Sequence, residues 1–121
     1  MINQEEYLEY CERKLGVTHN FPFDKSTWAM RVGDKIFALA DIDSWEFINL
    51  KCDPDKALEL RAENPGITGA YHMSKKHWNS VSLKGEVDAK LILELIDHSY
   101  DLVFKSLTKK KQQEILDTAN G

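Results

Sequence analysis

The segment AYHMSKKHWNSVSLKG, residues 70–85, gathers side chains that could bind a metal ion, act in catalysis or contact an anion. It contains two histidines, one tryptophan and three lysines, and it has no carboxylate. The whole chain is acidic, with 16 Lys and Arg residues against 20 Asp and Glu residues. A stretch free of negative charge in an acidic protein therefore suggests a surface that meets a negatively charged partner.

A metal site in this segment would start from His72 and His77. Two histidines five positions apart do not share a helix face, and on a strand they point to opposite sides. No cysteine or carboxylate between Ala70 and Gly85 completes a zinc ligand set. We expect no metal and no cofactor, with both histidines hydrogen-bonded in a turn and Trp78 packed beneath it.

Nucleophilic catalysis would start from Ser99, which follows Asp97 and His98. Adjacent residues diverge on a helix, so these three cannot form a triad by sequence adjacency. The chain also lacks a G-x-S-x-G motif, a glycine-rich phosphate loop and an H-E-x-x-H motif. We therefore expect a protein that is not an enzyme.

Among the functional candidates, a nucleic-acid surface fits the basic segment best. Lys and Arg supply charge to phosphates, Ser and Asn supply hydrogen bonds, and an exposed tryptophan can stack on a base. A solvated sheet face, whose cations only keep the protein soluble, is the alternative. The candidate DNA-binding residues are Arg31, Asn49, Lys51, Lys75, Lys76, His77, Trp78, Ser80, Ser82 and Lys84.

The first helix offers a rival site of another class. Glu5, Glu9 and Glu12 lie on one narrow stripe of the helix, where carboxylates could hold a hard cation or dock a protein partner. An ordinary solvated helix face explains the same stripe. Both interpretations stay open at this stage.

Helices and hairpins must position these residues. Asn3 and Glu6 form a capping box for a first helix that ends at Gly16. A long helix spans about residues 88–107, its apolar stripe wide enough to need cover on two sides. Helices are also expected at 54–64, after Asp53-Pro54, and at 109–118.

A Gly33-Asp34 turn joins strands 27–32 and 35–41 in a hairpin. Its register pairs Arg31 with Ile36, Met30 with Phe37 and Trp28 with Leu39, which places Leu39 on the core face and Ala38 and Ala40 on the other. In the next strand, 45–51, Ile48 and Leu50 face the core, whereas Phe47, Asn49 and Lys51 face outward. Segments 69–73 and 79–84 are expected to pair as a second hairpin joined through residues 74–78, with Ser80, Ser82 and Lys84 outward.

This order, α-β-β-β-α-β-β-α-α, predicts an α+β two-layer sandwich in which helices cover one face of an antiparallel sheet. The 121 residues suit a single domain, 1–121. The apolar runs are far shorter than the ~20 residues of a membrane span, and the acidic N-terminal segment has no signal-peptide pattern. With Cys11 and Cys52 matching no disulfide framework, we expect a cytoplasmic monomer.

Four segments in this order resemble the MmcQ/YjbR family of small bacterial proteins: FPFDKSTWAMRVGDKIFAL, NLKCDPDKALELR, PGITGAYHMSKKHWNSVSL and LIDHSYDLVFKSL. The resemblance covers nearly the whole chain. It implies a frataxin (CyaY)-like α+β fold and a double-wing arrangement of hairpins proposed to bind DNA, and it implies no reaction. In frataxin-like proteins an acidic first helix is also associated with iron binding and partner docking, which is the alternative for Glu5, Glu9 and Glu12.

Overall fold

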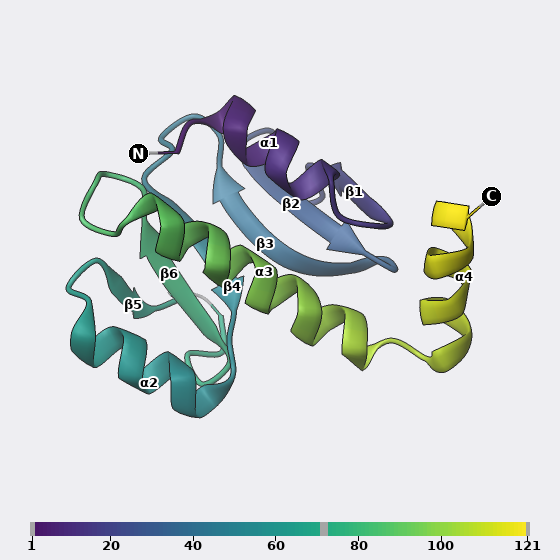
Figure 1. Cartoon of the computed structure of the whole chain (residues 1–121). Coiled ribbons are helices and arrows are strands. Elements are labelled where there is room, and N and C mark those ends of the chain that lie inside the picture. The colour runs from purple at the N-terminus through teal and green to yellow at the C-terminus, as the bar shows by residue number, and fades with distance from the viewer. Residues whose placement is uncertain (1, 71–72, 121) are drawn as a thin grey trace.

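The computed structural model describes residues 2–70 and 73–120. In this part of the chain the elements are α1 Gln4–Glu12, β1 Val17–Asn20, β2 Thr27–Val32, β3 Lys35–Asp41, β4 Phe47–Lys51, α2 Pro54–Glu63, β5 Ile67–Gly69, β6 Trp78–Ser82, α3 Ala89–Ser106 and α4 Lys109–Asn120. The strands form one antiparallel sheet in the order β1-β2-β3-β4-β6-β5. Helices α1 and α3 cross one face of this sheet, and α2 lies beside β5 and β6 (Figure 1). The predicted two-layer α+β architecture is confirmed.

Two strands differ from the sequence prediction. The edge strand β1, Val17–Asn20, was not predicted, because its residues are mostly exposed and show no apolar alternation. It pairs with β2, and Val17 lies opposite Val32. The second hairpin is confirmed as the antiparallel pair β5 and β6, but β5 is Ile67–Gly69 and not 69–73. Residues 71 and 72 lie outside the described part of the chain.

The first hairpin turns at Gly33 and Asp34, as predicted. Their φ angles of 56° and 68° are both positive, which the right-handed twist of a two-residue hairpin requires. Arg31 lies opposite Ile36, also as predicted.

Beyond this first pair the register changes, because Phe37 is an extra residue in β3. Met30 pairs with Ala38 instead of Phe37, which is a β-bulge. Phe37 stays on the helical side, where its ring packs edge-to-face on Tyr100 at 5.5 Å. Leu39 consequently points to the face that no helix covers. The predictions that paired Met30 with Phe37 and Trp28 with Leu39, placed Leu39 in the core and turned Ala38 and Ala40 outward are therefore wrong.

Helix α3 supplies most of the cover for the sheet. It is the predicted long helix, and its buried residues are Ile92, Leu95, Ile96, Ser99 and Val103. Helix α1 begins with the predicted capping box, in which the backbone N–H of Glu6 donates to the Asn3 side chain at 2.8 Å and Glu6 accepts from the Asn3 backbone. In the part of the chain that the structure describes, no helix is long and apolar enough to cross a bilayer.

Two side chains of α3 fix the end of β4. The Ser99 hydroxyl accepts from the backbone N–H of Lys51 at 2.9 Å and donates to the Phe37 carbonyl at 2.5 Å. His98 Nε2 accepts from the backbone N–H of Asp53 at 3.2 Å. The sequence segments K-C-D-P and L-I-D-H-S-Y therefore meet in space and share a structural role. Ser99 is fully buried, as its place on the apolar stripe predicted.

Candidate binding site on the open sheet face

The face of the sheet opposite the helices carries the side chains of alternate residues of β4 and β6. Across these strands Lys51 pairs with Trp78, Asn49 with Ser80, and Phe47 with Ser82. The intervening residues of β4, Ile48 and Leu50, are buried. The predicted orientation of β4 is confirmed. We call this surface the open face.

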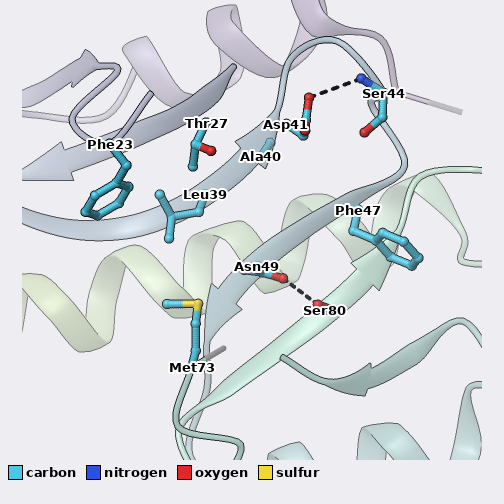
Figure 2. A pocket seen from close by; sticks show the side chains of 10 residues that line it. All are labelled: Phe23, Thr27, Leu39, Ala40, Asp41, Ser44, Phe47, Asn49, Met73 and Ser80. Atoms are coloured by element: carbon cyan, nitrogen blue, oxygen red, sulfur yellow. Dashed lines mark hydrogen bonds between the residues drawn. The ribbon is translucent and has the colours of Figure 1, made fainter. Parts of the chain in front are cut away.

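A hollow of about 760 Å³ lies on the open face. Its centre is a row of directly paired residues, Leu39 of β3, Asn49 of β4 and Ser80 of β6 (Figure 2). The volume lies within the ~300–1,000 Å³ typical of small-ligand sites. Its lining residues are Phe23, Thr27, Leu39, Ala40, Asp41, Ser44, Phe47, Asn49, Met73 and Ser80.

The rim of the hollow is apolar and accessible. Phe23 is 67% exposed and Phe47 is 43% exposed. Phe23 comes from the loop between β1 and β2, and Met73 comes from the segment before β6. The hollow therefore presents two accessible aromatic rings on one concave surface.

The floor of the hollow is neutral and polar. The Ser80 hydroxyl donates a hydrogen bond to Asn49 Oδ1 (Figure 2). The amide nitrogen of Asn49 has no acceptor among the described residues, so its two N–H groups are available to a ligand.

The basic end of the open face consists of Lys51, Lys75, Lys76 and His77. Lys51 is the last residue of β4, and the other three form the turn that enters β6. The backbone N–H of Cys52 donates to the His77 carbonyl at 2.8 Å, so the turn lies directly beside the end of β4. Lys75, Lys76 and His77 are exposed.

Arg61 of α2 anchors this turn. Its guanidinium donates to the carbonyl of Lys75 and, at 2.7 Å, to Oδ1 of the buried Asn79. The Ser74 carbonyl accepts from the N–H of Trp78 at 2.8 Å. The lysines of the basic end are therefore carried on a backbone that is fixed to both α2 and β4.

The opposite end of the open face is acidic. The Asp41 carboxylate accepts from the backbone N–H groups of Asp43 and Ser44 at 2.9 and 3.2 Å. Glu46 pairs with Lys84 at 3.9 Å, and the Lys84 ammonium lies 5.3 Å from the centre of the Phe47 ring. The hollow thus lies between a basic end and an acidic end.

The structure divides the predicted DNA-binding residues into two groups. Lys51, Lys75, Lys76, His77 and Trp78 come together at the basic end, and Asn49 and Ser80 form the floor. Arg31, Ser82 and Lys84 do not join them, and His72 lies outside the described residues.

The three residues that lie apart have their own partners. Arg31 donates to Asn20 Oδ1 at 3.1 Å and to the Asp34 carbonyl at 2.9 Å, near the hairpin turn. Ser82 is 2% exposed and donates to Glu86 at 2.9 Å, so the prediction that it faces solvent is wrong. Because Lys84 lies at the acidic end, Arg31, Lys51 and Lys84 do not form the single cationic layer expected from the strand phases.

The aromatic and apolar rim was missed by sequence reasoning. Leu39 was assigned to the core, because a bulge cannot be seen in the alternation of its strand. The F-P-F motif, two aromatics in an otherwise polar loop, was the available signal for Phe23. Phe47 was placed on the correct face but was given no role.

The rival site and the thiols show no equivalent geometry. Glu5, Glu9 and Glu12 are exposed on α1, and no cluster of three His, Cys, Asp or Glu side chains in the described residues is arranged to hold a metal. Burial raises the pKa of the Cys11 thiol to about 12, and burial also raises the pKa of Cys52. Neither thiol is therefore activated as a nucleophile.

Comparison with known proteins finds a family model and relatives that match this chain. A sequence model described as YjbR matches residues 13–102. The uncharacterized protein YbdF of Escherichia coli O157:H7 is 38% identical over 96 residues, which are 78% of this chain and 79% of YbdF. The uncharacterized protein YjbR of Escherichia coli K12 is 28% identical over 109 residues, which are 89% of this chain and 92% of that protein.

A solved structure has the same fold. The crystal structure of Deinococcus radiodurans protein DR2400, with domain DUF419, superposes with a TM-score of 0.89 at 36% sequence identity. The superposition covers 95% of this chain and 88% of that chain. Since the family model also spans most of the sequence, this chain belongs to the YjbR family.

Proposed function

We propose that the protein is a non-catalytic nucleic-acid-binding protein whose open face holds a single strand. The observation that carries this proposal is the hollow itself, which has exposed aromatic rings at its rim and a basic end beside it. Proteins that bind single strands combine these two features, because aromatic rings stack on bases and cations contact phosphates.

Each part of the site has a task in this function. Phe23 and Phe47 offer ring surfaces to the faces of unpaired bases. Lys51 and Lys76 offer positive charge to the phosphates that follow. The bases of a duplex are already stacked and paired, so a hollow rimmed by aromatic side chains favours a single strand over a double helix.

The charge distribution supports a local site over a general coating of DNA. The net charge of −4 opposes nonspecific binding over the whole surface. The acidic end, with Asp41 and Glu46, repels phosphates from one side of the hollow. A bound strand would therefore direct its backbone toward the basic end.

Fluorescence anisotropy with a labelled single strand of roughly 12 nucleotides tests the proposal. We expect salt-sensitive binding by the native protein. Loss of stacking in Phe23→Ala/Phe47→Ala should weaken binding by roughly 5- to 150-fold for each base that loses its ring. Parallel RNA and DNA strands show which sugar is preferred, and a duplex of the same sequence should bind more weakly.

The lysines are tested by the salt dependence of the same measurement. In Lys51→Gln/Lys76→Gln the slope of log K against log salt should fall by about 1.4, because each single-strand phosphate contact contributes about 0.7. Lys90→Gln, on the exposed surface of α3, is the matched control and should leave the slope unchanged. The proposal fails if the native protein shows no salt-sensitive binding, or if the duplex binds as tightly as the single strand.

A further inference from the structure

Asn49 is the residue at the centre of the hollow whose hydrogen-bonding capacity is incomplete. It lies between Leu39 and Ser80 in the row of paired strands (Figure 2). Its amide oxygen is engaged by the Ser80 hydroxyl, and its amide nitrogen has no acceptor in the described part of the chain. The side chain therefore presents donors to the hollow.

We infer that Asn49 determines which base the open face accepts, and that it selects a base with a carbonyl oxygen, such as thymine, over adenine. This inference rests on the proposed function, and it adds the chemical preference of the site. The rings at the rim contact the faces of a base, so an edge of the base turns toward the floor. An N–H donor on the floor matches a projecting carbonyl oxygen on that edge, whereas the projecting amino group of adenine is itself a donor.

The hydrogen bond from Ser80 disfavours the usual asparagine contact to adenine, because it takes one of the two acceptor positions of the amide oxygen and holds that oxygen toward β6. That contact is bidentate, with the amide oxygen accepting from the adenine amino group while the nitrogen donates to the ring. In this protein the Ser80 hydroxyl already donates to Asn49 Oδ1. Ser80 thus acts as a positioning residue that orients the amide with its nitrogen toward the ligand.

Binding of oligo-dT and oligo-dA strands of equal length tests the inference. The ratio of the two affinities is compared between the native protein and its variants, because that comparison cancels the strands' own stacking. One neutral hydrogen bond should give the native protein a preference for oligo-dT of roughly 2- to 10-fold relative to Asn49→Ala. Ser80→Ala, which frees the amide to rotate, should lose part of the same preference.

Asn49→Asp sharpens the test. It keeps an oxygen for Ser80 but replaces the donor with an acceptor, so the preference should shift toward the amino-bearing oligo-dA. Circular dichroism of each variant checks that the open-face substitutions leave the fold intact.

The outcomes separate the inference from the function on which it rests. If the native protein binds neither strand, both fall. If it binds both strands and Asn49→Ala leaves the affinity ratio unchanged, the selection by Asn49 is refuted while single-strand binding stands. A native preference for oligo-dA that Asn49→Asp preserves would also overturn the inference, because it requires the amide oxygen to face the hollow.

Discussion

The two faces of the sheet are built from the same strands but use their polar groups in opposite ways. On the helical face, the buried Ser99 has both a donor and an acceptor partner, and the buried Asn79 accepts from Arg61. On the open face, the Asn49 amide nitrogen has no acceptor in the described residues, and Phe23 is largely exposed. The difference teaches that the polar groups of the helical face are used for stability, whereas the open face leaves polar and aromatic groups accessible.

A matched pair of phenylalanines gives the largest expected contrast. Phe37→Ala removes a fully buried ring from the helical face and should lower the free energy of unfolding by about 3–5 kcal/mol. Phe23→Ala removes a ring that is 67% exposed and should cost less than about 1 kcal/mol. Urea denaturation of both variants measures the difference, and similar losses would erase the distinction between the faces.

A matched pair of serines gives the next contrast. Ser99→Ala leaves the backbone N–H of Lys51 and the carbonyl of Phe37 without their buried partner, which should cost about 2–4 kcal/mol. Ser80→Ala removes one bond on the accessible face and should cost about 1 kcal/mol or less. Equal changes in the denaturation midpoint would mean that the open face also carries structural hydrogen bonds.

The smallest expected effect is the pH dependence of folding stability that His98 contributes on the helical face. Burial lowers the pKa of His98 below its ordinary value of 6.5, and the neighbouring Lys56 and Lys105 ammonium groups act in the same direction. Asp53 and Asp101 oppose the shift. Between the lowered pKa of folded His98 and the ordinary pKa of the unfolded chain, the unfolded chain binds more protons than the folded chain. The contribution of His98 to stability is therefore complete above about pH 6.5.

This contribution of His98 should disappear as the pH falls from about 6.5 through the lowered pKa of the folded state. His98→Gln provides an acceptor for the Asp53 N–H without a titrating group, so it should remove this part of the pH dependence. Thermal unfolding of both proteins between about pH 5 and 7.5 spans that window. A steeper loss of stability in the variant at low pH would contradict the assignment.

Much of the fold could be predicted because its signals are local. The capping box at Asn3, the Gly33-Asp34 turn and the wide apolar stripe of α3 each depend on residues close in sequence. The outward orientation of Asn49 also follows from strand alternation. These local patterns were sufficient to predict the helices that cover the sheet and the outward orientation of the residues on the floor of the hollow.

The rest depends on contacts between distant segments. Phe23 reaches the hollow only because its loop lies near β3, and the buried Ser82 lies against the distant Gly66, whose carbonyl accepts from the Ser82 N–H. The exposed edge strand β1 carries no apolar alternation that would reveal it. No local pattern shows where a cation such as Lys84 will find its carboxylate partner.

The extra residue Phe37 has a consequence for how such a site can originate. With simple alternation in β3, Leu39 would lie opposite Trp28 and point toward the helices, and the centre of the open face would lose one of its walls. The shape of the open face thus depends on the number of residues in one strand as well as on their identity. A one-residue insertion or deletion at this point would turn every following side chain of β3 to the other face, a change that no point substitution can produce.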